Sequence, residues 1–233
     1  MGYEENKETY KHTVLPEKAY FPLRGRHVFF HSEENGILGI KLAALYGETG
    51  KGENVPIIHI FGASGSGTSS LGRALQENYN YTHLDTDDYY WLPTNPPFIE
   101  KRSTEERLNL MRRDIGKSSQ SVISGSLCGW GDALIPLFDL VVRLVVPAEE
   151  RIFRLKKREY QRFGGRILAG GDMYEEHQKF LQWASEYDNG DISMRSKAMH
   201  DEWQKEISCT QITLDGTLSP QSLMKEIKII FPL

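Results

Sequence analysis

From residue 55 onward, short apolar runs alternate with longer segments in which apolar residues recur at helical spacing. The short runs predict strands at residues 56–61, 81–84, 121–124, 140–146 and 211–214. The longer segments predict helices at residues 69–78, 104–115, 148–162, 175–186, 196–206 and 220–230. Because nearly all-apolar strands alternate with helices, we predict an α/β fold with a parallel five-stranded sheet covered by helices on both faces.

The N-terminal part of the chain follows a different pattern. Residues 20–31 predict a hairpin, residues 37–46 a short helix, and the polar, glycine-containing stretch 47–54 a linker. We therefore predict an N-terminal extension of unknown role at residues 1–54 and a single domain at residues 55–233.

Composition narrows the class of protein. The 28 Lys and Arg residues against 32 Asp and Glu residues give a formal charge of −4, which disfavours a broadly basic, nucleic-acid-binding surface. Cys128 and Cys209 are too few for a disulfide scaffold and indicate reduced thiols. No stretch approaches the ~20 apolar residues needed to span a bilayer. We predict a soluble cytoplasmic protein with neither nucleic acid nor membrane as a partner.

A glycine-rich loop follows the first predicted strand and opens the first predicted helix. It consists of Gly62, Ala63, Ser64, Gly65, Ser66, Gly67, Thr68 and Ser69. This is the phosphate-binding frame G-x-x-x-x-G-K-[ST] with Thr68 in the lysine position. Glycines let several N–H groups converge, the helix N-terminus adds its positive dipole end, and Ser69 stands where a hydroxyl ligates Mg²⁺. The alternative is a turn that only connects strand and helix.

Thr68 removes one mobile cation from this frame. An ion pair at ~4 Å and an effective dielectric near 20 is worth about 4 kcal/mol before desolvation. Phosphoryl transfer would therefore be weakened unless another cation takes the place of the lysine.

Carboxylates and aromatic residues follow the second predicted strand. Asp85 and Asp87, two apart in an extended chain, are expected to point the same way beside the phosphate loop. One can attend Mg²⁺ and the other can accept a proton from an attacking hydroxyl, with Asp88 as the substitute for Asp87. The alternative is an acidic turn. The next three residues either stack on an acceptor or simply pack: Tyr89, Tyr90 and Trp91.

Basic residues dominate the helix predicted after the fourth strand. Four arginines fall within an arc of about 80° on this helix: Arg151, Arg154, Arg158 and Arg162. Paired glycines follow at 164–165 and 170–171 and are plausible hinges. The alternative is a solvated basic helix face.

The loop, the Asp-Thr-Asp sequence and this arginine-rich helix together resemble the P-loop small-molecule kinases of the adenylate kinase and shikimate kinase group. The resemblance covers about residues 55–233. The same stretch, through L-D-T-D-D-Y-Y-W and S-G-S-L-C-G-W-G-D, is also similar to bacterial proteins labelled adenylate kinase-like. It implies a three-layer P-loop NTPase fold of the nucleotide-kinase type.

The resemblance also implies roles for residues. Residues 62–69 would hold the phosphates of ATP, Ser69 and Asp85 would attend Mg²⁺, and Asp87 would orient or deprotonate the acceptor. A lid would close arginines over the phosphates, and the candidates on it are Arg158, Arg162 and Arg166. Arg195 is the candidate for a second such cation.

Two positions depart from the family pattern. Thr68 replaces the lysine, and Ser124-Gly125-Ser126 stands where nucleotide kinases have Asp-Gly. The second departure argues against a simple nucleoside-monophosphate kinase. These three residues either line an acceptor pocket or form a tight exit from a buried strand.

The sequence thus predicts ATP- and Mg²⁺-dependent phosphoryl transfer to a nucleoside, nucleotide or polyol-type acceptor. The alternative is a non-catalytic nucleotide-binding sensor, or pseudokinase, which Thr68 favours. An ATPase or GTPase switch is disfavoured because no N-K-x-D motif is present and the third strand lacks a terminal aspartate. The histidines show no zinc-ligand spacing, and His200 is predicted to lie on a helix surface.

Overall fold

The computed structural model describes residues 20–23, 26–29 and 56–233. Two units make up the chain, Met1–Asn54 and Val55–Leu233. In the first, β1 (Tyr20–Leu23) pairs antiparallel with β2 (Arg26–Phe29), as the predicted hairpin requires. The helix and the linker predicted at 37–46 and 47–54 lie outside the described residues.

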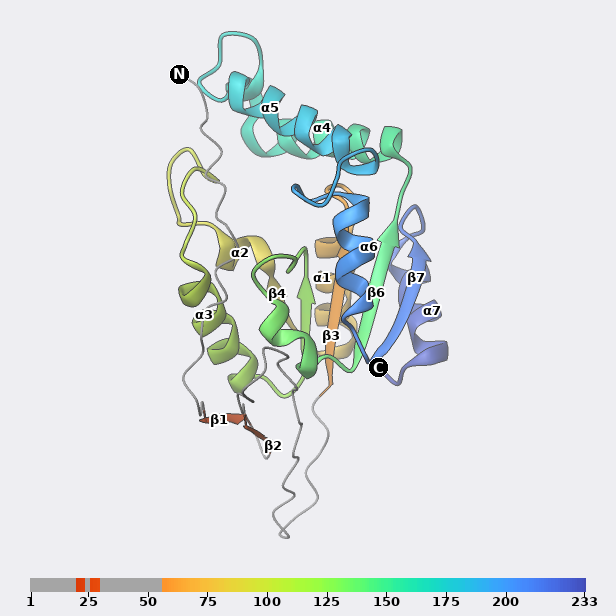
Figure 1. Cartoon of the computed structure of the whole chain (residues 1–233). Coiled ribbons are helices and arrows are strands. Elements are labelled where there is room, and N and C mark those ends of the chain that lie inside the picture. Colours follow the sequence, from red (N-terminus) through yellow and green to blue (C-terminus); the bar gives the residue numbers. More distant parts are fainter. Residues whose placement is uncertain (1–19, 24–25, 30–55) are drawn as a thin grey trace. The chain divides into compact units, whose positions relative to one another are not determined.

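A five-stranded parallel sheet forms the centre of the second unit (Figure 1). Its strands are β3 (Ile57–Gly62), β4 (Thr82–Asp85), β5 (Ser121–Ser124), β6 (Leu140–Val145) and β7 (Thr210–Asp215). They lie in the order β4-β5-β3-β6-β7, so the strand that leads into the glycine-rich loop is central. A central strand is covered on both faces, which explains why every residue of β3 is buried.

All the predicted helices of this unit are present, and their bounds differ from the predicted ones by at most two residues. The α-helices are α1 (Thr68–Tyr79), α2 (Thr86–Tyr90), α3 (Thr104–Lys117), α4 (Ala148–Phe163), α5 (Tyr174–Ser185), α6 (Lys197–Lys205) and α7 (Pro220–Ile230). Short 3₁₀ helices occupy η1 (Asp132–Leu137), η2 (Gly164–Ile167) and η3 (Glu186–Asp188). The short helix α2 was not expected from the sequence.

Helices cover both faces of the sheet. On one face, Leu71 of α1 and Leu223 of α7 pack with Ile60 of β3. On the other, Met111 of α3 and Trp203 of α6 belong to a second buried cluster. Helices α4 and α5 cross beyond the carboxyl ends of the strands (Figure 1). The architecture confirms the predicted fold class, a three-layer P-loop NTPase fold of the nucleotide-kinase type.

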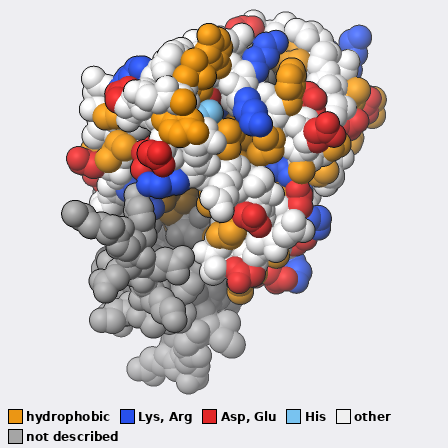
Figure 2. Space-filling model, turned by 90° about the horizontal axis from the view of Figure 1, so that it is seen from above, with side chains coloured by type: hydrophobic (Ala, Val, Ile, Leu, Met, Phe, Trp, Pro, Cys, Tyr) orange, Lys and Arg blue, Asp and Glu red, His pale blue; other side chains and the backbone are white. Residues whose placement is uncertain are grey.

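Among the described residues, no helix combines the length and the apolar character that crossing a bilayer requires. On the face seen in Figure 2, basic, acidic and apolar side chains are intermixed.

Candidate functional site

The glycine-rich loop joins β3 to α1 through a tight turn. The Ser66 N–H donates to the Ala63 carbonyl at 3.0 Å, and the helix begins at Thr68. Gly65 and Gly67 have φ values of 84° and 96°, in the left-handed region that favours glycine. The loop therefore turns back on itself just before the helix, as the phosphate-binding frame requires.

Two glycines also let the loop pass close to neighbouring backbone. A Cβ on Gly62 would lie 2.6 Å from the Leu144 carbonyl oxygen of β6, and one on Gly65 would lie 2.6 Å from the Arg151 carbonyl oxygen of α4. Any larger residue would push the loop away from these elements. The loop is thus held between the sheet and the arginine-rich helix.

The start of α1 leaves hydrogen-bond donors for a ligand. Gly67 is the N-cap and has no side chain to accept from the first N–H groups, and the first turn holds no acidic residue. The Ser66 hydroxyl is buried and has no partner among the described residues. Uncapped N–H groups at the positive end of a helix dipole form a site that can bind an anion.

The acidic strand end has a different geometry from the one expected. Asp85 ends β4 and caps α2, because its Oδ1 accepts the N–H of Asp87 at 3.1 Å. Asp87 therefore lies in the first turn of a helix, and the expectation of an extended chain with both carboxylates on one side is wrong. β5 also lies between β4 and β3, so this strand end is one strand removed from the loop.

The surroundings of Asp87 separate it from Asp88. Burial raises the pKa of Asp87, Arg195 and then Arg158 lower it, and Asp85 raises it. Burial and Asp85 raise the pKa of Asp88, and His83, Arg102 and Arg73 lower it; neither Arg195 nor Arg158 is among these charges. Asp87 is accordingly the carboxylate on which Arg195, the arginine in contact with the loop, acts electrostatically.

The three arginines predicted for a lid have different surroundings. The Arg158 Nε donates to Glu159 Oε1 at 2.8 Å. Arg162 lies 5.8 Å from the ring centroid of Phe98, and Arg166 forms an exposed ion pair with Asp172 at 2.6 Å. Of the three, Arg158 acts electrostatically on Asp87. The lid role of all three stays a prediction.

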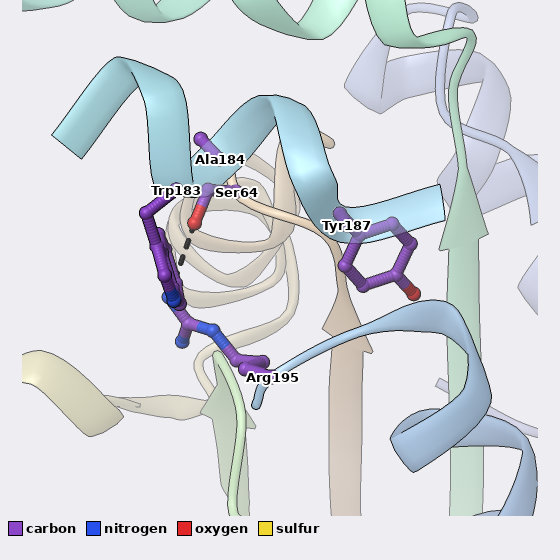
Figure 3. Close-up of a pocket in the computed structure, with 5 residues that line it drawn as sticks. All are labelled: Ser64, Trp183, Ala184, Tyr187 and Arg195. Atoms are coloured by element: carbon purple, nitrogen blue, oxygen red, sulfur yellow. Dashed lines mark hydrogen bonds between the residues drawn. The ribbon is translucent and has the colours of Figure 1, made fainter. Parts of the chain in front are cut away.

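Arg195 is the arginine that touches the loop. Its Nη2 donates to Ser64 Oγ at 3.0 Å, although the two residues are 131 positions apart. Its guanidinium lies 4.7 Å from the ring centroid of Trp183 in α5. Ser64, Trp183, Arg195, Ala184 and Tyr187 line a small pocket beside the loop (Figure 3).

A second arginine, Arg154, reaches the loop from α4. Its Nη1 donates to the Gly216 carbonyl at 2.8 Å and its Nε pairs with Glu150 at 2.7 Å. A Cβ placed on Gly67 would lie 3.9 Å from that Nη1. A Cβ on Gly216, in the turn after β7, would lie 2.7 Å from the Ser66 carbonyl oxygen. The turn after β7 therefore borders the loop, which no sequence motif indicated.

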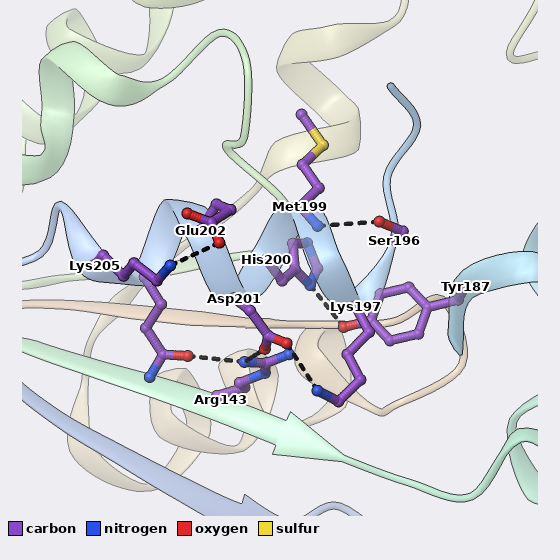
Figure 4. A network of polar contacts seen from close by, with 10 residues as sticks. Arg143, Tyr187, Ser196, Lys197, Met199, His200, Asp201, Glu202 and Lys205 are labelled. Atoms are coloured by element: carbon purple, nitrogen blue, oxygen red, sulfur yellow. Dashed lines mark hydrogen bonds and ion pairs between the residues drawn. The ribbon is translucent and has the colours of Figure 1, made fainter. Parts of the chain in front are cut away.

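His200 is fully buried, so the prediction of a surface histidine is wrong. Its Nδ1 is 2.8 Å from the Tyr187 hydroxyl and its Nε2 is 3.2 Å from Ser126 Oγ. Burial, followed by Arg195 and Arg143, lowers its pKa to about 3. Beside it, Arg143 of β6 donates to Asp201 at 2.6 Å (Figure 4). Through this network, the side of α6 that carries His200 and Asp201 packs against the sheet.

The exit of β5 is tightly packed. The Ser124 hydroxyl is 2.8 Å from His83 Nε2, and Ser126 contacts His200. Gly125 has a φ of 107°, and a Cβ there would lie 1.9 Å from Thr86 Oγ1. These contacts favour the tight strand exit over an acceptor pocket lined by the two serines.

Of the aromatic residues after Asp88, Tyr89 packs in the core and donates to Asp114 at 3.2 Å. Tyr90 instead stacks on Arg107, whose guanidinium lies 3.8 Å from the centroid of the Tyr90 ring. Arg107 is 7% exposed and its Nε has no partner. Within the described residues it forms no ion pair with a carboxylate. Sequence reasoning missed Arg107, because a single charge in a helix carries no signal of burial.

Comparisons with known proteins agree with this architecture. Residues 58–178 match the AAA domain family AAA_18. An uncharacterized protein of Bacillus subtilis (strain 168), YqaC, is 47% identical over 162 residues, covering 70% of this chain and 89% of that protein. A cytidylate kinase of Methanocorpusculum labreanum is 29% identical over 113 residues, covering 44% of this chain and 62% of that protein.

Among solved structures, shikimate kinase from Acinetobacter baumannii in complex with shikimate superposes with a TM-score of 0.46 and 16% identity. It covers 76% of this chain and 93% of that chain. The family match spans more than half of the 233 residues, and the Bacillus relative is aligned over most of its own length. The chain therefore belongs to the AAA domain family AAA_18.

Proposed function

We propose that this protein transfers the terminal phosphoryl group of ATP to a hydroxyl or phosphate of a small metabolite. The observation that carries the proposal is the uncapped start of α1 within the loop at residues 62–69, with Arg195 in contact with the loop and acting electrostatically on Asp87. The kinase name of the Methanocorpusculum relative supports phosphoryl transfer in general. The cytoplasmic location and the lack of a nucleic-acid partner stay predictions.

In this proposal the loop holds the donor phosphates through main-chain N–H groups. Ser69 and Asp85 fit Mg²⁺, because this ion prefers oxygen ligands. One carboxylate oxygen of Asp85 accepts the Asp87 N–H, and the other oxygen could bind the ion. No group of three His, Cys, Asp or Glu residues is placed to hold a metal in the described part of the chain, so waters and phosphate oxygens would complete the shell. When bound, Mg²⁺ neutralises charge on the donor phosphates.

Asp87 acts on the acceptor. The acceptor oxygen attacks the terminal phosphorus, its proton passes to the Asp87 carboxylate, and the bond from phosphorus to the bridging oxygen breaks to release a nucleoside diphosphate. A pKa raised by burial suits a group that must take up a proton near neutral pH. Closure of the segment that carries Arg158, Arg162 and Arg166 would add positive charge and exclude water.

Arg107 narrows the class of acceptor. A buried guanidinium without a carboxylate partner is costly and is stabilised by an anion. Tyr90 and Trp130 lie beside it, with their ring centroids 3.8 Å and 5.7 Å from the guanidinium. We therefore expect an acceptor that carries a carboxylate or phosphate in addition to the group that is phosphorylated.

The test is transfer from labelled ATP with Mg²⁺ to a panel of anionic and neutral nucleosides, nucleotides and polyols. Asp87→Asn should lower kcat by about 10²–10⁴-fold, the usual contribution of a general base. Asp88→Asn is the matched control and should stay within about twofold, because neither Arg195 nor Arg158 is among the charges that shift the pKa of Asp88. Undiminished transfer by Asp87→Asn would remove Asp87 from the mechanism.

The alternative is a nucleotide sensor that binds without turnover. Thr68 in the lysine position favours it. Calorimetry that measures tight ATP binding, together with no transfer to any acceptor in the panel, would select the sensor.

A further inference from the structure

We infer that Arg195 supplies the positive charge that Thr68 removes from the loop, by contacting the terminal phosphate of a bound nucleoside triphosphate. The inference rests on the proposed function of the loop as a phosphate site. It assigns to a residue outside the loop the role that a lysine within the loop has in the ordinary frame.

The first argument is position. The Arg195 Nη2 lies 3.0 Å from Ser64 Oγ, and Ser64 is the third residue of the loop (Figure 3). Arg195 is also the first-ranked charge that lowers the pKa of Asp87. Its guanidinium thus contacts the donor loop and acts electrostatically on the candidate base.

The second argument is charge. The neighbouring arginines are already neutralised by carboxylates, in the pairs Arg151–Asp188, Arg154–Glu150, Arg143–Asp201, Arg158–Glu159 and Arg166–Asp172. Within the described part of the chain, Arg195 forms no ion pair with a carboxylate. Its charge therefore remains for a ligand, and a guanidinium fork binds phosphate oxygens in a bidentate way.

The third argument is that Arg195 is held in place. Trp183 stacks on its guanidinium. The next residue, Ser196, is buried, caps α6 and donates to the Asp191 carbonyl at 2.6 Å. His200, one turn further, is fixed by Tyr187 and Ser126. A cation ordered in advance loses less entropy on binding than a free lysine side chain.

The test is a rescue experiment on the full chain. Thr68 is only partly buried, so Thr68→Lys has room for the ordinary lysine. The proteins compared are wild type, Arg195→Ala, Arg195→Ala with Thr68→Lys, and Arg195→Ala with Thr68→Met as the uncharged control. Calorimetry measures the affinity for ATP, AMP and inorganic tripolyphosphate, and steady-state assays measure kcat and KM.

Arg195→Ala should weaken ATP and tripolyphosphate binding by about 10- to 100-fold, the range for hydrogen bonds to charged groups, and AMP binding by less than about twofold. The drop in kcat should be about 10³-fold, as for arginines that stabilise phosphoryl transfer. Thr68→Lys should restore at least about tenfold of the lost ATP affinity, and Thr68→Met should restore none.

Three results would overturn the inference: equal losses for ATP and AMP, no rescue by Thr68→Lys, or a rise confined to the KM of the acceptor. Thermal unfolding checks that each variant is folded, and Arg195→Lys provides a milder second variant. Loss of ATP-over-AMP discrimination in a protein that transfers nothing would support the inference while the proposed enzyme activity failed. Transfer that is intact in Arg195→Ala would sink the inference and leave the proposed activity standing.

Discussion

The glycine-rich loop and the segment that carries Arg195 both line the small pocket beside Ser64, but they offer different kinds of hydrogen-bond donor. The loop consists of consecutive residues, and its donors are main-chain N–H groups. Arg195 stacks on Trp183 of α5, and His200, one turn beyond Ser196, is held by Ser126 after β5 and by Tyr187 of η3. The comparison leads to the inference drawn above: the loop keeps its main-chain donors without the lysine, and the tertiary structure brings Arg195 to it.

The largest expected effect is on ATP binding by the glycine-rich loop. Gly65→Val should abolish measurable ATP binding, a loss of more than about 100-fold, because left-handed φ and a 2.6 Å approach to the Arg151 carbonyl both exclude a side chain. Calorimetry on folded protein measures it.

Gly164→Ala is the matched control for that change. Gly164 also has a positive φ, 55°, but a Cβ there would meet nothing within 4 Å. It should cost about 1 kcal/mol of stability and leave ATP affinity unchanged. Equal binding losses in both variants would mean that backbone strain, and not the approach to α4, explains the effect.

An intermediate effect is expected from the buried histidines near Arg195, as a dependence of the free energy of unfolding on pH. Burial lowers the pKa of both His200 and His59 to about 3, while the unfolded chain binds these protons near pH 6.5. The unfolded state therefore binds more protons between those values, and the free energy of unfolding should fall as pH drops through this window. At pH 5 each histidine contributes a loss of about 2 kcal/mol.

Denaturant unfolding at pH 7, 6 and 5 measures this loss, and His200→Gln should remove about half of the slope between pH 7 and 5. His177→Gln is the comparison variant, because His177 lies in α5 and its ring forms no hydrogen bond within the described residues. A slope unaltered by His200→Gln would contradict the assignment of buried, neutral His200.

The smallest expected effect concerns Trp183. Trp183→Ala should weaken ATP binding by about two- to fivefold, the value of a partly exposed cation–π contact. Phe180→Ala is the control, since Phe180 stacks on Trp183 with centroids 6.1 Å apart and no contact joins it to Arg195 in the described structure. Competition titrations resolve the difference, and an effect above that of Arg195→Ala would reassign the phosphate contact to Trp183.

The strands, the long helices and the loop could be predicted from the sequence, because apolar spacing and glycine placement are local signals. Asp87 shows where local reasoning failed. The sequence D-T-D was expected to be extended, but Asp85 accepts the Asp87 N–H and starts a helix instead. The prediction for His200 failed for another reason, because the side chains that hydrogen-bond to its buried ring, Tyr187 and Ser126, come from other parts of the chain.

By itself, the sequence determined the α/β class, the order of the elements and a loop able to bind an anion, since each follows from contacts between neighbours along the chain. Only the tertiary structure decided which arginine reaches that loop. Most of the arginines nearby are paired with carboxylates, whereas Arg195 has no carboxylate partner among the described residues and contacts Ser64, 131 positions away in the sequence. Pairing of charges depends on distances in space, which spacing along a chain does not reveal.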